Sequence, residues 1–199
     1  MADLEKTGKN LEGRGFRVHR FASGAEAAEF LVQTLHGTSI GIGGSVTIDT
    51  LGVYDRLCGS NEVFWHWKNH APETRERAGK AETYLCSANG VSENGEIVNI
   101  DGFGNRVAGT IYGPERVFLV VGRNKIAPDL TGAIDRARNI AAPLNARRLN
   151  RHTPCAVGEP RCHDCRSPEK VCGVMTVFFM PPTSIKEFHA ILVDEDLGY

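Results

Sequence analysis

The sequence predicts an α/β fold with a mainly parallel central sheet and flanking helices. Two observations support this prediction: short apolar or β-branched runs are typical of buried strands, and they alternate with segments whose apolar residues recur at helical spacing. The chain has 199 residues, 41% of them hydrophobic, and no linker or low-complexity segment divides it. We therefore expect a single domain over residues 1–199 with one substantial core.

Strand and helix patterns alternate through the first eighty residues. Short strand patterns occupy residues 16–21, 39–43 and 63–67. Residues 25–35 form a helical pattern whose apolar face carries Ala28, Leu31, Val32 and Leu35. Two further helical patterns follow, over residues 46–57 and 72–80, and the second begins with a proline, which is tolerated at a helix start.

The middle of the chain reads as β-rich, and a long helix follows it. Four strands are predicted, separated by turns rich in Gly, Asn and Asp: residues 83–87, 97–100, 106–111 and 116–121. The helix has an apolar stripe of Leu130, Ile134, Ala137, Ala141 and Leu144. We expect its solvated face to carry Arg136, Arg138, Arg147, Arg148 and Arg151. The final strands are predicted at residues 174–179 and 190–193.

Charge and hydropathy exclude some classes of function. The formal net charge of −1 argues against bulk nucleic-acid binding. The N-terminus lacks the apolar region of a signal peptide, and the apolar run at residues 117–121 is far too short to span a bilayer. We expect a cytoplasmic protein without a membrane span.

Four of the six cysteines fall within residues 155–172, in a loop over residues 152–173 that precedes the last strands. Cys162 and Cys165 form a Cys-x-x-Cys hook, and Cys155 and Cys172 flank it at gaps of six residues. Four thiolates complete a structural zinc site or hold a [4Fe–4S] cluster. The alternative is a set of reduced thiols or two disulfides. We favour the metal centre, and we expect Cys58 and Cys86 to be buried apolar residues instead.

A glycine turn offers the first candidate for ligand binding. Gly41-Ile42-Gly43-Gly44-Ser45 follows a strand and precedes a helix, so its amides and the Ser45 hydroxyl are suited to a phosphate or carboxylate. It matches neither the dinucleotide fingerprint nor a Walker loop. A tight turn in which Ser45 merely caps the helix is the alternative.

Two further loops carry polar residues at the ends of predicted strands. In the first, Glu93, Asp101 and Arg106 offer a nucleophile, a base and an anion clamp, although Asp101 and Gly102 also suit a simple hairpin turn. In the second, Lys125 follows a buried strand. Because parallel strands gather such loops at one edge, we expect a shared cleft. The residues expected to bind a small anion are Gly43, Gly44, Ser45, Asn89, Gly90, Asn105, Arg106, Gly122, Asn124 and Lys125.

Taken in order, five motifs resemble the lactate-utilisation (LUD) domain family. They are Gly-Gly-Ser at 43–45, Ala-Asn-Gly-Val-Ser-Glu-Asn-Gly at 88–95, Gly-Asn-Arg at 104–106, Tyr-Gly-Pro at 112–114 and Val-Gly-Arg-Asn-Lys-Ile at 121–126. The resemblance implies a fold like that of CoA transferases and ribose-5-phosphate isomerase. It also implies a role in bacterial L-lactate oxidation beside iron–sulfur subunits, with this chain in a cysteine-bearing branch.

The segment Ser92-Glu93-Asn94-Gly95 also resembles a CoA-transferase motif, in which the glutamate carries CoA as a thioester. That resemblance makes Glu93 a catalytic nucleophile, with Lys125 or Arg106 neutralising an anion. Three functions therefore stay open. The leading one is an accessory protein of lactate oxidation with an anion site and a metal centre held by the four clustered cysteines. The others are an acyl- or CoA-transferring enzyme and a structural zinc protein that binds partners.

Overall fold

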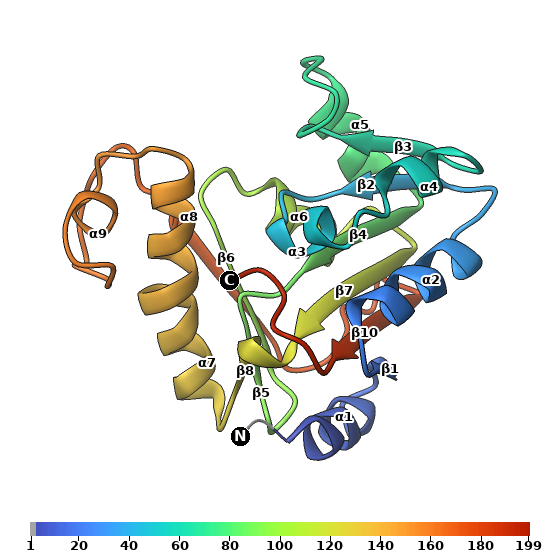
Figure 1. Cartoon of the computed structure of the whole chain (residues 1–199), viewed down its shortest axis with the longest axis horizontal. Helices are drawn as coiled ribbons and strands as arrows, with labels where there is room; N and C mark the ends of the chain where they lie inside the picture. The colour runs from blue at the N-terminus through green and yellow to red at the C-terminus, as the bar shows by residue number, and fades with distance from the viewer. Residues whose placement is uncertain (1–2) are drawn as a thin grey trace.

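A computed structural model describes residues 3–199 and shows a central sheet of six parallel strands (Figure 1). The strand order is β1 (Arg17–Phe21), β10 (Glu187–Val193), β7 (Arg116–Gly122), β4 (Thr83–Ser87), β2 (Ser39–Ile42) and β3 (Glu62–Trp65). Helices flank this sheet on both faces, so the predicted α/β class with a mainly parallel sheet is confirmed.

Both faces of the central sheet are buried, which explains why its strands read as continuous apolar runs. Along β7, Phe118 and Val120 face α2 (Gly24–Thr34), α3 (Val46–Thr50) and α4 (Tyr54–Cys58). Val117 and Leu119 face the opposite layer, which contains α1 (Leu4–Gly13), α5 (Thr74–Lys80) and α6 (Asn105–Ile111).

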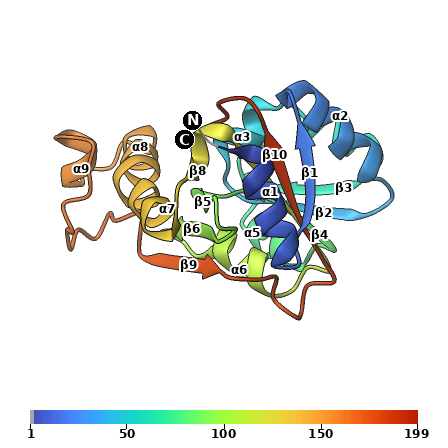
Figure 2. The same ribbon diagram turned by 90° about the horizontal axis from the view of Figure 1, so that it is seen from below.

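A second sheet of four strands lies beside the first, visible from below in Figure 2. Its order is β8 (Ile126–Ala127), β5 (Gly90–Ser92), β6 (Ile97–Asp101) and β9 (Val174–Phe178). The predicted long helix packs against this sheet as α7 (Leu130–Arg136), a π-helical turn η2 (Ala137–Ala141) and α8 (Ala142–Arg148). The cysteine loop, which includes α9 (Pro154–Val157), connects α8 to β9.

Two predicted elements differ from the structure. Residues 106–111, predicted as a strand, form α6, because the Asp101 carboxylate accepts hydrogen bonds from the backbone amides of Arg106 and Val107 at the helix start. Asp101 therefore leads into a helix and not into a hairpin. Residues 46–57 divide into α3 and α4, because Gly52 has a left-handed φ of 63°. No element was predicted at α1, β5 or β8.

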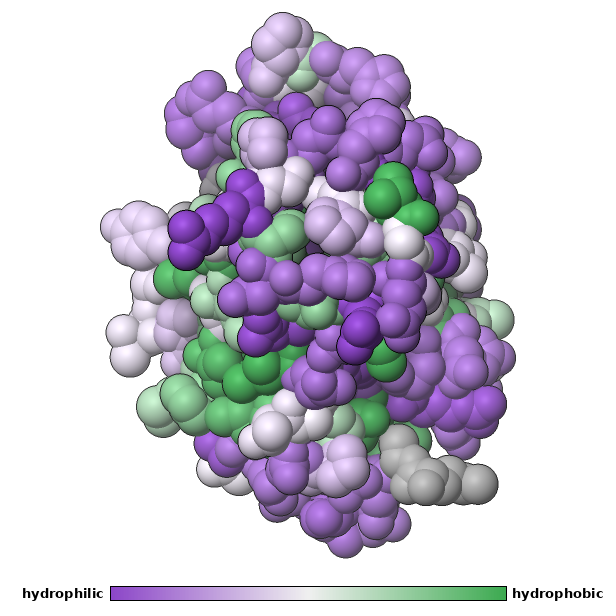
Figure 3. All heavy atoms as spheres, turned by 90° about the vertical axis from the view of Figure 1, so that its left-hand side faces the viewer, coloured by the Kyte–Doolittle hydropathy of each residue, from purple (hydrophilic) through white to green (hydrophobic). Residues whose placement is uncertain are grey.

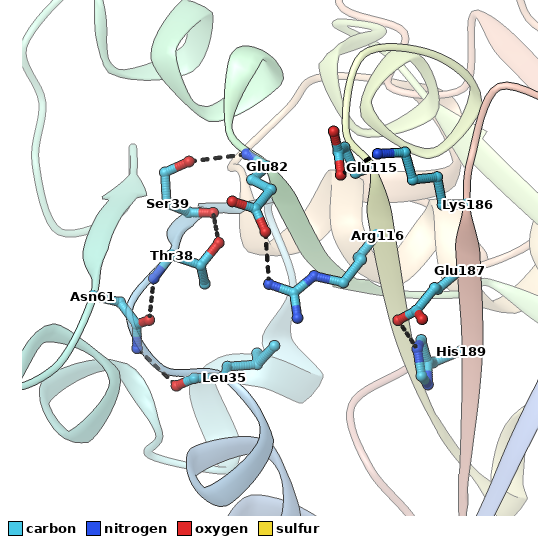
Figure 4. Close-up of polar contacts among 10 residues, drawn as sticks. All are labelled: Leu35, Thr38, Ser39, Asn61, Glu82, Glu115, Arg116, Lys186, Glu187 and His189. Atoms are coloured by element: carbon cyan, nitrogen blue, oxygen red, sulfur yellow. Dashed lines mark hydrogen bonds and ion pairs between the residues drawn. The ribbon is translucent and has the colours of Figure 1, made fainter.

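Polar contacts within the chain join the strands and loops at the N-terminal edge of the central sheet to one another (Figure 4). The guanidinium of Arg116 donates to Glu82 at 3.0 Å, and Asn61 bridges the carbonyl of Leu35 and the amide of Thr38. The loops after β2, β4 and β7 lie at the opposite edge, and they are the candidates for binding a ligand. None of the helices within residues 3–199 combines the length and apolar character that crossing a membrane requires.

Candidate functional site

Two adjoining spaces lie at the C-terminal edge of the central sheet. The inner cavity, about 40 Å³, is formed by the loops after β2, β4 and β7 together with η2 and α8. The outer cleft, about 810 Å³, shares Gly44, Trp67, Arg106 and Arg148 with it. Cations dominate the walls of the outer cleft: Lys68, Arg75, Arg106, Arg148, Arg151 and Lys170 stand against Asp49, Asp101 and Glu169.

Lys125 is the most buried charged group of the inner cavity, with 2% of its surface exposed. It lies in the short helix η1 (Arg123–Lys125) directly after β7. Its Nζ donates to the hydroxyl of Thr47 at 2.7 Å and to that of Ser87 at 2.8 Å. Burial, and then the positive charges of Arg136 and Arg106, hold the pKa of Lys125 well below its ordinary value.

Arg106 joins the loops of the cavity through neutral acceptors. Its guanidinium donates to the side chain of Asn89 at 2.9 Å and to that of Asn99 at 3.3 Å, and it also bonds the carbonyls of Ser87 and Ile100. The charge of Arg106 is therefore fixed at the cavity wall without a carboxylate as its hydrogen-bond partner.

Of the arginines expected on a solvated helix face, Arg136 is buried beside this site, and Arg148, which is exposed as expected, also lines it. Arg136 is 7% exposed and donates to the carbonyls of Asn89 and Asn124, and burial lowers its pKa to about 10. Arg148 lines both spaces, and its guanidinium lies 4.5 Å from the ring centre of Trp67. A basic stretch alone does not reveal which arginines face inward. The π-helical turn, which carries Ala141 to the cavity wall, could not be seen in the sequence either.

The glycine turn lies where the sequence predicts it. Gly44 and Ser45 line the inner cavity, and the Ser45 hydroxyl caps α3 by accepting from the amide of Ile48. A Cβ on Gly43 would lie within 3.0 to 3.2 Å of Tyr84, Cys86 and Arg106. Glycine at this position therefore lets the side chain of Arg106 pack against the turn.

The structure brings only some of the expected residues together. Ser45, Asn89 and Lys125 line the inner cavity, and Asn105 lines the outer cleft. Gly90, Gly122 and Asn124 support the surrounding backbone, and neither space is lined by them. A Cβ on Gly90 would meet the carbonyl of Ala133 at 2.5 Å, and one on Gly122 would meet the amide of Leu197 at 2.6 Å. Asn124 donates to the carbonyl of Gly198.

Glu93 lies away from both spaces, in the turn between β5 and β6. Its carboxylate pairs with Lys6 at 3.0 Å and accepts from the backbone amide of Asp3. The bond from Lys6, followed by the one from Asp3, lowers the pKa of Glu93. This carboxylate joins the turn to the N-terminal helix, and the structure does not place it beside Lys125 or Arg106.

The four clustered cysteines line one cavity, which we call the cysteine cavity: Cys155, Cys162, Cys165 and Cys172. Burial raises the pKa of Cys172, the nearby charge of Lys170 acts against that increase, and the neighbouring Cys162, Cys165 and Cys155 add to it. The Cys162 sulfur accepts from Arg138 and from the amide of Asp164, both at 3.4 Å.

A donor set of four thiols around one space matches the ligands of zinc and of [4Fe–4S] clusters. Within residues 3–199, however, no three His, Cys, Asp or Glu side chains are arranged to hold a metal ion. The other two cysteines differ from each other. Cys86 is buried, as expected, whereas Cys58 is exposed at the end of α4, contrary to the expectation.

The cysteine cavity and the inner cavity share a wall. Ala142 and Val171 line both of them, and Lys170 lines both the cysteine cavity and the outer cleft. Figure 3 shows the molecule from the side on which α8 and α9 lie, where hydrophilic side chains cover much of the surface and a hydrophobic patch is exposed in the lower half of the view. The conformation of the cysteine loop therefore shapes one wall of the inner cavity and of the outer cleft.

Comparisons with known proteins show both a family and a fold. The LUD-domain family model matches residues 4–193. The fold is similar to that of a DUF162 family protein from Deinococcus radiodurans, whose crystal structure was determined at 1.70 Å resolution. The match has 14% identity and a TM-score of 0.56, and it covers 96% of this chain and 95% of that chain. Comparison with curated proteins found no match.

Proposed function

The chain belongs to the LUD-domain family, and on that premise we propose that it is an accessory protein of L-lactate oxidation that binds a small organic anion in the inner cavity. Membership of this family indicates a role related to lactate utilisation. Lactate and its oxidation product pyruvate are both small carboxylates. The substrate and product of that pathway therefore have the charge that the inner cavity is suited to receive.

One observation carries the proposal. Arg106 and Arg148 line the inner cavity, and the buried Arg136 donates to the carbonyl of Asn89 in its wall, yet within residues 3–199 none of these three guanidinium groups lies within ion-pair distance of a carboxylate. Uncompensated positive charge in a partly desolvated site is costly, and a bound anion relieves that cost. Lys125 lines the same cavity and donates to the hydroxyls of Thr47 and Ser87.

Calorimetric titration tests the anion site. We expect lactate and pyruvate to bind the purified protein, and we expect Arg148→Gln to weaken that binding about tenfold, because one charge-assisted contact is lost. The matched control is Arg56→Gln, since Arg56 is a half-exposed arginine that pairs with Glu29, away from both spaces. Absence of binding by both acids, or equal weakening by both substitutions, would contradict the proposal.

We further propose that the four cysteines hold a metal centre, either [4Fe–4S] or zinc. Support comes from the shared cavity and from the N–H groups that point at the Cys162 sulfur. The protein groups that would hold the metal are Cys155, Cys162, Cys165 and Cys172. A cluster would supply a site for one-electron transfer, whereas zinc would only pin the loop.

Anaerobic purification with metal analysis separates the two kinds of centre. A brown protein with stoichiometric iron and sulfide indicates a cluster, and a colourless one with stoichiometric zinc indicates the structural site. Cys162→Ser should lose the metal in either case, whereas Cys58→Ser should keep it, because Cys58 is exposed on α4. Full metal content in the Cys162→Ser variant would contradict the proposed centre.

Partners and chemistry follow from the same premise. We expect association with iron–sulfur subunits of lactate oxidation, which co-purification from a lactate-grown host would detect.

A relation to CoA transferases leaves open an enzyme that uses Glu93 as a nucleophile. The ion pair of Glu93 with Lys6, outside both spaces, favours the binding proposal over that alternative.

A further inference from the structure

The hydrogen bonds around Lys125 match a neutral amine. The hydroxyl of Thr47 donates to the carbonyl of Leu197 at 3.1 Å, and the hydroxyl of Ser87 donates to the carbonyl of Val120 at 2.6 Å. Because each hydroxyl hydrogen is committed to a carbonyl, both oxygens must accept from Lys125 Nζ. A neutral amine has two N–H groups for these two acceptors, and its lone pair stays free.

The surroundings of Lys125 also favour the neutral form. Burial is the largest cause of its lowered pKa, and the positive charges of Arg136 and Arg106 add to that effect. The neighbouring thiol of Cys86 is fully buried, and burial raises its pKa to about 12, so it stays uncharged and does not stabilise an ammonium ion. A lysine desolvated beside other cations is the usual environment of a nucleophilic amine.

From this geometry we propose that Lys125 is a nucleophilic residue that forms an imine with the carbonyl carbon of a small 2-oxo acid bound in the inner cavity. This inference deepens the proposed anion site and rests on it. The carbonyl group must face Lys125 Nζ. The carboxylate would then face the positive charges of Arg106 and Arg148, which line the same cavity.

The reaction balances without any redox partner. The lone pair of Lys125 Nζ attacks the carbonyl carbon, the electrons of the C=O π bond move to oxygen, and the oxygen gains a proton while nitrogen loses one. The hydroxyl group of the resulting carbinolamine then gains a proton and leaves as water, the nitrogen lone pair forms the C=N bond, and the nitrogen loses its remaining amine proton. Lysine and oxo acid thus give an imine and one molecule of water. Lactate, which lacks a carbonyl carbon at that position, cannot react in this way.

Borohydride trapping tests the proposal. The full-length protein is incubated with pyruvate at neutral pH and treated with sodium borohydride, whose hydride reduces the imine carbon to a stable secondary amine. Mass spectrometry should then find a mass gain of pyruvate plus two hydrogens less one water, and peptide mapping should place it on Lys125. Incubation with lactate and borohydride should leave the protein unmodified.

Two variants separate this chemistry from surface labelling. Lys125→Met should abolish the adduct, whereas Lys186→Met should keep it, because Lys186 lines neither space and pairs with Glu115 at 2.7 Å at the N-terminal edge of the sheet. An adduct spread over surface lysines, or one that persists in Lys125→Met, would overturn the proposal.

Calorimetry on the same samples distinguishes the two proposals. If pyruvate and lactate bind but no adduct forms on Lys125, the imine chemistry is wrong and the anion site stands. If neither acid binds and no adduct forms, both proposals fail. Circular dichroism of Lys125→Met should match the unsubstituted protein, because methionine fills a similar volume and the hydroxyls of Thr47 and Ser87 keep their carbonyl acceptors.

Discussion

Positively charged side chains have different partners at the two edges of the central sheet. The first is the N-terminal edge, and the second is the opposite edge, which carries the inner cavity. At the N-terminal edge, Arg116 pairs with Glu82 at 3.0 Å and Lys186 pairs with Glu115 at 2.7 Å (Figure 4). In and beside the inner cavity, the side chains of Lys125, Arg106 and Arg136 donate to hydroxyls, side-chain amide oxygens and backbone carbonyls, and to no carboxylate among residues 3–199.

The difference separates an edge whose charges are paired within the chain from an edge where the charged groups bond only neutral acceptors. Where the chain itself supplies the carboxylate, the charge is already neutralised and contributes modestly to stability. Where the chain supplies neutral acceptors, the side chains are oriented but their charge is not neutralised by a carboxylate within the described residues, which is the basis of the proposed anion site.

Gly43→Ala should disturb the edge that carries the inner cavity, and we expect it to have the largest effect on stability. The added methyl group would press on Tyr84, Cys86 and Arg106, so we expect a loss of about 1–3 kcal/mol in the free energy of unfolding. Arg106 would also shift, so pyruvate binding should weaken. Urea unfolding and calorimetry measure the two effects. Gly13→Ala is the control, since a Cβ there meets nothing within 4 Å, and equal losses in both variants would show that crowding is not the cause.

His189 tests how the N-terminal edge of the sheet contributes to stability, because this residue is buried there on β10. Its Nδ1 lies 2.9 Å from His19 Nε2, its Nε2 lies 3.3 Å from Glu187, and its ring stacks on Phe118. Burial lowers the pKa of His189 from 6.5 to about 4.

The unfolded chain therefore binds more protons than the folded protein between these two pKa values, and stability should fall as the pH drops through that window. We expect His189 to account for about 2 kcal/mol of the loss between about pH 8 and pH 5. His19, Glu187 and Arg17 are the other titratable or charged groups that face it. Denaturant unfolding of His189→Gln should show a smaller loss over the same range. An identical pH dependence would contradict the assignment.

Lys125→Met should sharpen the contrast between the edges by raising stability. We expect a gain of about 1–2 kcal/mol at neutral pH, because a desolvated amine is replaced by an apolar chain of similar length. The unfolded chain holds this proton up to the ordinary lysine pKa of 10.5, whereas the folded protein releases it at lower pH.

Stability of the unsubstituted protein should therefore rise with pH through that interval, and the gain from methionine should shrink towards about pH 10. The comparison variant is Arg116→Met at the paired edge, where we expect a loss of up to about 1 kcal/mol. A large destabilisation by Lys125→Met would mean that Lys125 serves the fold and not a ligand.

Glu93→Gln should have the smallest effect. We expect a change of less than about 0.5 kcal/mol in stability, because its pair with Lys6 lies near the surface. Pyruvate binding should be unchanged. If acyl-CoAs instead left a hydroxylamine-sensitive adduct that disappeared in this variant, Glu93 would be the nucleophile of a transferase.

The sequence predicted the central sheet well because its strands are buried on both faces and read as apolar runs. It also placed Ser45, Asn89 and Lys125 in loops after strands, where parallel topology brings them together. Residues 106–111 read as a strand because they include several β-branched side chains. Only the folded structure shows that the Asp101 carboxylate caps a helix there.

Other parts of the site could not be predicted from local patterns. Arg136 looks like a surface residue in the sequence, and its burial depends on how α7 packs against the second sheet. The exposed Arg148 reaches the cavity wall through the packing of α8. Thr47 and Ser87 are ordinary hydroxyl residues until Lys125 is placed between them. These contacts join segments that are far apart in the chain, and no spacing rule encodes them.

A crystal structure of the protein grown with pyruvate tests the anion site most directly. We expect electron density for one pyruvate in the inner cavity, with its carboxylate facing Arg106 or Arg148 and its carbonyl carbon facing Lys125. Pyruvate bound only in the outer cleft or on the surface, with an inner cavity that holds water at saturating concentration, would contradict the assignment of this edge as the ligand-binding edge.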